Sequence, residues 1–315
     1  MNKVLSDLLH SLSSKSDPIG TLPLDHLSDL DTDTANSLGI LWGTIPAPRR
    51  IDLLKELGDR EAIQFDLDFS EVYYLGLKDS EPEAVANSIN NLSQIENTNF
   101  FPSLIELLIH TDTLIREAAA DALGRFVYLG ELEEISSEDS DRIVNLLLNT
   151  FRTDSSIEVR CRSLESLGYS SHKDVPGILL SSFNSGDLVL AVSAMKAISR
   201  SADSSWKSLI LDHLHNTHPE IRLEAVRAAG ELEIREARSD LIELLEDVDR
   251  QVHLAAIWSL AQIGGDNIQE LLTQIQSETG DIEETDLIED ALDLLEFNAG
   301  TGDFLLLDLE EGQSD

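Results

Sequence analysis

The chain has 315 residues, of which 42% are hydrophobic, enough to form a sizeable buried core. With 60 acidic and 22 basic residues its formal net charge is −38, which disfavours binding to nucleic acid or anionic membranes and favours basic partners. The single cysteine, Cys161, excludes an internal disulfide, and no apolar run approaches about 18 residues or resembles a secretory segment, so we expect a cytoplasmic protein.

Residues 1–23 precede the repeating part of the chain. The stretch LSDLLHSLSSKSD, followed by Asp17-Pro18 and Gly20, predicts a short helix and a loose lead-in rather than a repeat.

The next segment, LDHLSDLDTDTANSLGILWGTIP, places Asp29, Asp31 and Asp33 at alternate positions, as in the first half of a calcium-binding loop. However, Thr34 stands where such a loop needs glycine, and Ile40 stands where the bidentate glutamate belongs. The segment therefore predicts an acidic helix start and no metal site.

From residue 24 to residue 297 one pattern recurs. Leu190, Ile221 and Val252 follow one another at steps of 31 residues, each with Ala at +4 and an apolar residue at +8. The same opening position, numbered 0, is assigned to Arg49, Ala84, Ile115, Val159, Leu190, Ile221, Val252 and Leu287. Mostly small residues at +4 beside apolar residues at +8 predict a helix face that approaches its neighbours closely.

Each repeat is predicted to contain two helices. Apolar segments such as PSLIELLI and KSLILDHL lie about half a period before the opening positions and suit a first helix. Start signals for the second helix are Asp112, Asp187 and Asp249 at −3, and Pro82 and Pro219 at −2. One step is 13 residues longer, around YLGELEEISSEDSD, and this insertion is predicted to be a loop. The predicted fold class is all-α, a right-handed α-solenoid of about eight helical hairpins.

Three second helices begin with an Ile/Val-Arg pair, namely Ile115-Arg116, Val159-Arg160 and Ile221-Arg222. With Ala or Ser at +4 and, less regularly, Leu-Gly at +8 and +9, they resemble the bacterial HEAT-like repeats of the bilin-lyase (PBS lyase) type over residues 24–297. The resemblance implies a solenoid fold and indicates function only weakly, because such repeats serve mostly as interaction scaffolds.

The residues offer little support for catalysis. HEAT-like enzymes that bind iron, such as deoxyhypusine hydroxylase, use His-Glu dipeptides, and none of the eight histidines here is followed by Glu. His213, His215 and His218 are predicted to be solvated or capping, and Cys161 to be a small, partly buried hydrophobe. No phosphate-binding loop or nucleophile motif occurs, so we expect no catalytic residue, metal or cofactor.

Offsets +3, +6 and +10 lie beside the core positions of the second helices, which usually line the concave side of such solenoids. In the middle repeats they carry cationic and aromatic side chains, the concave lane: Arg125, Arg162, Tyr169, Lys196, Arg200, Arg227 and Trp258. Arg, Tyr and Trp are over-represented at binding hot spots, so the lane is predicted to be a continuous, largely exposed partner-binding surface. The alternative is a solvated helix face stabilised by i, i+4 pairs.

The leading functional hypothesis is a non-catalytic protein-protein interaction scaffold that uses the concave face. The alternative is a bilin-lyase-like or lyase-accessory protein that handles a chromophore and its acceptor protein. Binding to DNA in the manner of HEAT-like glycosylases is disfavoured by the charge of −38.

Residues 298–315 form an acidic-hydrophobic tail. The sequence NAGTG at 298–302 is predicted to end the last helix and to start a flexible joint. Large apolar residues follow, interleaved with Asp and Glu: Phe304, Leu305, Leu306, Leu307 and Leu309. We expect this tail to pack back around Leu292 and Leu295 as a cap, with a motif that docks on a partner as the alternative.

Overall fold

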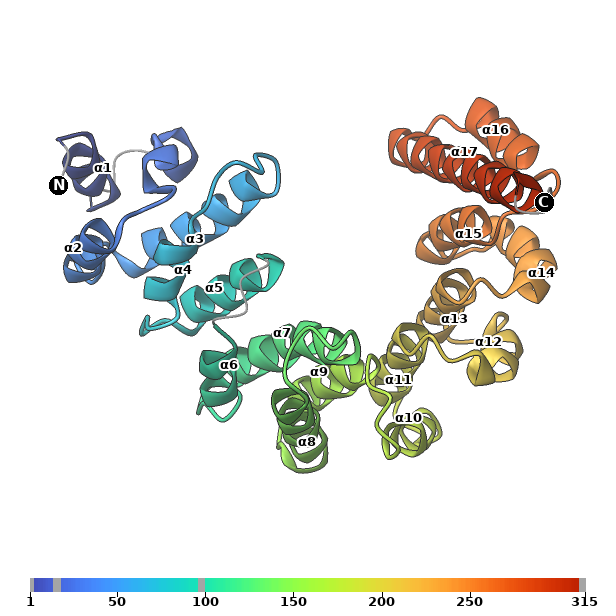
Figure 1. Ribbon diagram of the computed structural model, residues 1–315, viewed down its shortest axis with the longest axis horizontal. Coiled ribbons are helices and arrows are strands. Elements are labelled where there is room, and N and C mark those ends of the chain that lie inside the picture. Colours follow the sequence, from blue (N-terminus) through green and yellow to red (C-terminus); the bar gives the residue numbers. More distant parts are fainter. Residues whose placement is uncertain (1–2, 14–17, 96–99, 312–315) are drawn as a thin grey trace. The chain divides into compact units, whose positions relative to one another are not determined.

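The computed structural model describes the backbone of residues 3–13, 18–95 and 100–311, and the side chains of residues 7–13, 18–95 and 100–298 (Figure 1). Helices are the only regular elements in these ranges, which confirms the all-α fold class and the helical solenoid. The chain divides into two compact units, Met1–Ser166 and Leu167–Asp315.

The first unit begins with α1 (Lys3–Ser13) and the short 3-10 helices η1 (Ile19–Thr21) and η2 (Leu24–Leu27). The longer helices that follow are α2 (Thr32–Trp42), α3 (Ala47–Glu61), α4 (Ser70–Gly76), α5 (Pro82–Gln94), α6 (Phe101–Leu107), α7 (Thr113–Glu131), α8 (Ser137–Thr153) and α9 (Ile157–Leu167). The last residue of α9 is the first of the second unit.

The second unit continues with α10 (Val175–Phe183), α11 (Leu188–Arg200), η4 (Ser204–Trp206), α12 (Lys207–His213), α13 (Pro219–Glu231), η5 (Arg235–Ala237), α14 (Arg238–Glu243), η6 (Leu244–Glu246), α15 (Arg250–Ile263), α16 (Ile268–Glu278) and α17 (Ile282–Glu311). These are the predicted helix pairs, in the predicted order.

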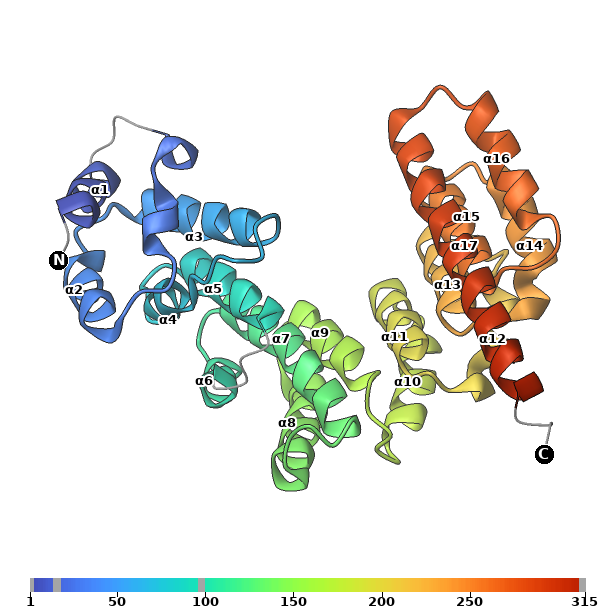
Figure 2. The ribbon, with the colours of Figure 1, turned by 45° about the horizontal axis from the view of Figure 1, so that its top comes forward.

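Each unit has two layers of helices. The second helices of consecutive repeats pack on one another, α3 on α5 and α5 on α7 in the first unit, and α11, α13, α15 and α17 in turn in the second. The first helices α10, α12, α14 and α16 pack mainly on the second helix of their own repeat (Figures 1 and 2). We call the two sides the second-helix layer and the first-helix layer.

The predicted register explains the core. Position +4 is fully buried in the first seven assigned repeats: Leu53, Ser88, Ala119, Ser163, Ala194, Ala225 and Ala256 are each 0% exposed. Position +8 is buried in the same seven repeats. Small residues at +4 therefore let neighbouring second helices approach, while larger ones at +8 fill the space between them.

The predicted helix starts are confirmed. The side chains of Asp112, Asp187 and Asp249 accept hydrogen bonds from backbone N–H groups of the first turns of α7, α11 and α15. Pro82 and Pro219 are the first residues of α5 and α13. These caps satisfy donors that the helix cannot pair internally, so the sequence codes for each start locally.

The register of the last repeat was wrong by three residues. The N–H of Glu284 donates to Asp281 Oδ1 at 3.2 Å and α17 begins at Ile282, so Asp281 is the residue at −3 and Glu284, not Leu287, is position 0. Glu284 is buried and is paired with His253 at 3.0 Å. A hydrophobic pattern alone misses a buried carboxylate at this position because its partner lies 31 residues away.

The predicted loop insertion is wrong as well. The extra residues lengthen two helices, α7 to 19 residues and α8 to 17 residues, and leave only a short turn at 132–136. Ser136 caps α8 by accepting from the N–H of Asp139 at 3.1 Å. Leu and Glu are good helix formers, so residues 128–131 extend α7 to Glu131 before the turn.

The N-terminal segment is better packed than a loose lead-in. Leu8, Leu9 and Leu12 of α1 are buried, and the Arg49 guanidinium donates to the carbonyl oxygens of Ser11 and Leu12. The apolar face of α1 therefore packs on the segment that follows it, including η2.

At the other end, α17 continues through residues 298–302 to Glu311, so the predicted joint is wrong. Glycine inside a helix costs only about 1 kcal/mol, and the leucines that follow are good helix formers. The side chains of Phe304, Leu305, Leu306, Leu307 and Leu309 lie outside the described residues, so the roles of capping and docking stay predictions.

Candidate partner-binding site

Close contact between second helices is built from a glycine and a polar side chain. An added Cβ at Gly124 would lie 2.7 Å from Ser166 Oγ, and that hydroxyl donates to the Ala120 carbonyl at 2.8 Å. Gly230 has the same relation to Ser259, which donates to the Val226 carbonyl at 2.9 Å. Glycine at +9 thus makes room for a buried hydrogen bond between adjacent repeats, which holds the second-helix layer rigid.

Three buried ion pairs, the Arg–Asp ladder, join consecutive repeats. In each pair the arginine at +1 of one second helix binds the aspartate at −5 of the next repeat with Nε and Nη2: Arg50–Asp79, Arg116–Asp154 and Arg222–Asp247. The shortest contacts are 2.6, 2.8 and 2.6 Å, and the aspartate side chains are 0%, 11% and 7% exposed. Bidentate arginine–carboxylate pairs of this kind fix the relative orientation of the two side chains as well as pairing their charges.

Each ladder aspartate also caps its own turn, by accepting from the backbone N–H two residues later. Burial by itself would raise the pKa of Asp79, Asp154 and Asp247, but the arginine and this N–H group hold the pKa of each below its ordinary value. The arginines of the Ile/Val-Arg motif therefore have a structural role at Arg116 and Arg222. Arg160 differs, since it donates to the Phe151 carbonyl at 2.9 Å and lies over the Phe151 ring.

Two residues of the concave lane lie in the first unit. Arg125 on α7 donates to the Ser93 carbonyl at 2.7 Å. Arg162 on α9 pairs with Glu117 at 3.2 Å and with Glu165 at 2.8 Å, and the Glu165 side chain is only 3% exposed. Both guanidinium groups are therefore held in place by neighbouring helices or turns.

The other five lane residues lie in the second unit. The Arg200 guanidinium lies over the Tyr169 ring at 5.3 Å, within the range of a cation–π contact. Arg227 on α13 pairs with Glu224, whose side chain is 8% exposed, at 3.0 Å. Trp258, on the neighbouring α15, is 37% exposed.

The lane is less exposed than predicted. Arg227 and Trp258 are exposed, whereas Arg125, Arg162, Tyr169, Lys196 and Arg200 are half-buried. The offsets alone correctly place these residues beside the core, but their side chains lie against neighbours such as Glu117 and Ser93 that are distant in sequence. Lane residues occur in both units, and continuity of the whole set stays a prediction.

Other residues singled out by the sequence have structural partners. Asp31 is the N-cap of α2 and accepts from the N–H of Thr34 at 2.7 Å, as predicted in place of a calcium site. His213 contacts the Leu209 carbonyl and His215 contacts Asp240, while His218 occupies the N-cap position of α13. Cys161 is 6% exposed, in agreement with its predicted burial.

Comparison with protein families agrees with this geometry. Residues 207–290 match a family model described as HEAT repeats, and residues 100–129 match one described as HEAT repeat. Two stretches of the chain carry HEAT repeats. The longer stretch includes α13 and α15, and with them Arg227 and Trp258. No protein with a curated description matches the chain.

Several solved structures resemble the chain. YibA of Escherichia coli is 16% identical, with 90% of this chain and 98% of that chain covered and a TM-score of 0.46. Human deoxyhypusine hydroxylase in complex with glycerol is 16% identical, with 93% and 96% covered and a TM-score of 0.36. Importin beta is 12% identical, with 93% of this chain but 46% of that chain covered and a TM-score of 0.46. These likenesses are too distant to indicate a function.

Within the residues that the structure describes, none of the helices has both the length and the apolar character needed to cross a bilayer.

Proposed function

We propose that the chain is a non-catalytic interaction scaffold whose second-helix layer, the concave face in the predicted solenoid, binds a protein partner. The observation that carries this proposal is the pair Arg227 and Trp258, exposed on the adjacent helices α13 and α15. Glu224, almost fully buried, orients Arg227, so part of the cost of ordering this long side chain on binding is already met. An oriented arginine and an exposed tryptophan on adjacent helices have the composition of a binding hot spot.

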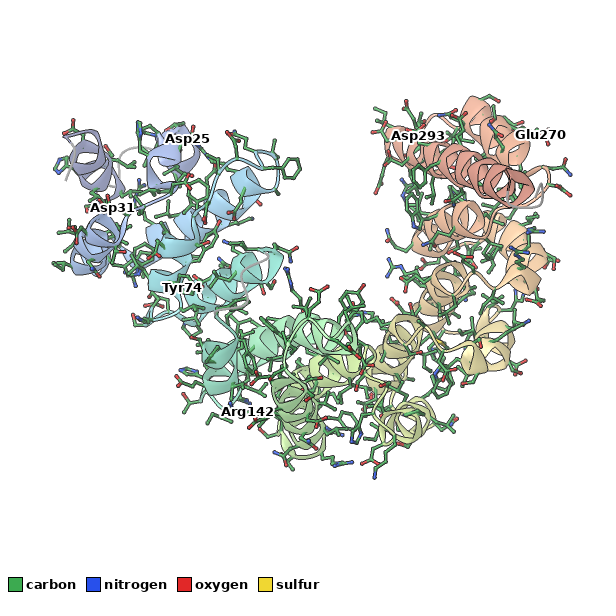
Figure 3. All side chains as sticks on the ribbon, in the orientation of Figure 1. Asp25, Asp31, Tyr74, Arg142, Glu270 and Asp293 are labelled. Atoms are coloured by element: carbon green, nitrogen blue, oxygen red, sulfur yellow. The ribbon has the colours of Figure 1, made fainter. Side chains whose placement is uncertain are left out.

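The charge of the second-helix layer changes along the second unit. Lys196, Arg200 and Arg227 lie on α11 and α13, whereas α17 exposes Asp286, Asp290 and Asp293. Figure 3 shows Asp293 on this last helix. A partner with an acidic segment for the cations and a basic segment for α17 fits this surface, and such charge matching sets orientation and association rate.

The proposal is tested by capture from lysate of the native cell. The double variant Arg227→Ala, Trp258→Ala should lose proteins that the unmodified chain retains, since truncating two anchors costs a few kcal/mol. Its matched control is Arg142→Ala, Trp206→Ala, which removes the same residue types from the first-helix layer. Retention of the same proteins by both variants would contradict the proposal.

The bilin-lyase-like function remains the alternative and rests on the resemblance of the repeat motif. It predicts a complex that absorbs visible light after co-expression with a source of bilin. A colourless chain that still captures its partner through Arg227 and Trp258 would favour the scaffold.

A further inference from the structure

The first unit contains a cavity of about 410 Å³ at the C-terminal ends of α3 and α5. Its apolar lining comes from Ala62, Phe65, Leu67 and Ile95, and its polar lining includes Glu61 and Asn91. The volume is in the range of sites that hold a side chain or a small molecule. None of these residues belongs to the concave lane.

The floor of the cavity is rigid. Asn91 donates from Nδ2 to the Leu54 carbonyl at 2.8 Å, and an added Cβ at Gly58 would lie 2.4 Å from Asn91 Oδ1. Gly124 and Gly230 make the same close contact with a polar side chain of the next second helix, but there the side chain is a serine and here it is an asparagine. The cavity therefore rests on two second helices locked at close approach.

The segment that follows α3 exposes large apolar side chains. Phe65, which lines the cavity, is 92% exposed, and Ile63, two residues earlier, is 79% exposed. Full burial of such a side chain is worth about 1.5–3 kcal/mol, so a partner that covered both would gain substantially. Adjacent exposed apolar side chains beside a cavity are typical of interaction sites.

A fixed carboxylate completes the site. Glu61 Oε2 accepts from the Tyr73 hydroxyl at 2.9 Å and Glu61 Oε1 accepts from the Phe69 N–H at 3.4 Å. The neighbouring cation, Arg60, is directed elsewhere, toward Asp25, Glu56 and the Gly20 carbonyl. Further acidic residues occur nearby in sequence at 59, 66 and 68, so a cation is the complementary charge.

We propose that this cavity binds a lysine or arginine of a partner protein together with an adjacent large aliphatic residue. The aliphatic side chain enters the lining at Leu67 and Ile95, the alkyl stem of the cation packs on Phe65, and its charged end meets Glu61. The inference rests on the proposed scaffold function and specifies the chemistry of one partner segment.

The test is an NMR titration of the full, isotope-labelled chain with a peptide of sequence GSGLKGSG, blocked at both ends. We expect shifts confined to residues 58–67 and 91–95, and markedly weaker binding of GSGLEGSG. Glu61→Gln and Phe65→Ala should each weaken binding of the lysine peptide by about tenfold, which corresponds to 1.4 kcal/mol. The matched controls are Glu71→Gln and Ile40→Ala, which change an exposed acid and an exposed isoleucine elsewhere in the unit.

Absent shifts, shifts spread over the surface, or equal binding of the glutamate peptide would each overturn the inference. Thermal melting of both pocket variants separates loss of binding from loss of folding, and Glu61→Gln keeps an acceptor for the Tyr73 hydroxyl. If Arg227 and Trp258 are needed to capture the partner but the peptide does not bind, only the inference about the cavity is contradicted. If the peptide binds in the cavity but the partner is captured equally well without Arg227 and Trp258, only the proposed role of the second-helix layer is contradicted.

Discussion

The second-helix layers of the two units share their packing and differ in what they display. Gly58 with Asn91 in the first unit and Gly230 with Ser259 in the second make the same close approach. Yet the first unit presents a mainly apolar cavity with a fixed carboxylate, and the second presents Arg227, which is paired with Glu224, and the exposed Trp258. The same stacking positions thus support different surfaces, and in the first unit Gly58 and Asn91 themselves line the cavity.

The largest effect is expected from breaking a shared stacking position. Ala225→Arg places a charge at a +4 position that is 0% exposed, which should lower the free energy of unfolding by roughly 3–5 kcal/mol. Urea unfolding followed by circular dichroism measures the loss. Gln251→Arg, at an exposed site on α15, should change it by less than about 0.5 kcal/mol. Equal stability of the two variants would show that the assigned register is wrong.

The next effect compares a buried ion pair with an exposed one. Arg222→Ala leaves the nearly buried Asp247 carboxylate without its guanidinium and should cost about 3 kcal/mol. Arg250→Ala removes a partner from Asp281, whose side chain is 40% exposed, and should destabilise the chain much less than the loss of the buried pair. Equal losses in the same unfolding measurement would contradict the structural role of the ladder.

Glycine-to-alanine substitutions sharpen the comparison further. An added Cβ at Gly230 would lie 2.8 Å from Ser259 Cα, so Gly230→Ala should destabilise the chain by about 1–3 kcal/mol despite the better helix propensity of alanine. Gly177 has no neighbour within 4 Å of an added Cβ, so Gly177→Ala should stabilise α10 by up to about 1 kcal/mol. Thermal melts would show opposite shifts, and shifts of the same sign would argue against the close approach.

The smallest effect is a dependence on pH. Because the folded state lowers the pKa of Asp79, Asp154 and Asp247, their contribution to stability is complete above the unfolded pKa of about 3.9. This contribution to stability is lost as the pH falls below the unfolded pKa and then through the lower pKa of the folded state. Unfolding free energies measured from pH 5 downward should therefore decline less steeply in the double variant Arg222→Ala, Asp247→Asn. Parallel curves would exclude this pair from the acid response.

The fold could be predicted because its determinants are short-range and repeated. Asp187 caps α11 two and three residues away, and Ala194 is buried because of a spacing visible in the sequence. The last register failed because Glu284 is buried against His253 in another repeat. Carboxylates at such positions look exposed until their partner is known.

The candidate site could be predicted only in part. Offsets placed Arg227 and Trp258 on an exposed face, but not the contact of Arg162 with Glu117, which lies 45 residues away. The cavity beside Phe65 was missed because it depends on where α3 ends relative to α5, which no local spacing encodes. The ion pairs of the ladder did have a sequence signal, since an aspartate stands at −5 of the repeat that follows Arg50, Arg116 and Arg222.

The Arg–Asp ladder also has a direction. In all three pairs the arginine precedes its aspartate in the chain, so during synthesis the cation leaves the ribosome first and each aspartate emerges to find its partner already present. A protein that ends between Arg222 and Asp247 keeps a guanidinium that has lost its carboxylate and still donates to the Asn216 carbonyl at 2.6 Å. One that begins at Asp247 keeps a carboxylate that has lost its guanidinium and still accepts from the Asp249 N–H at 2.8 Å.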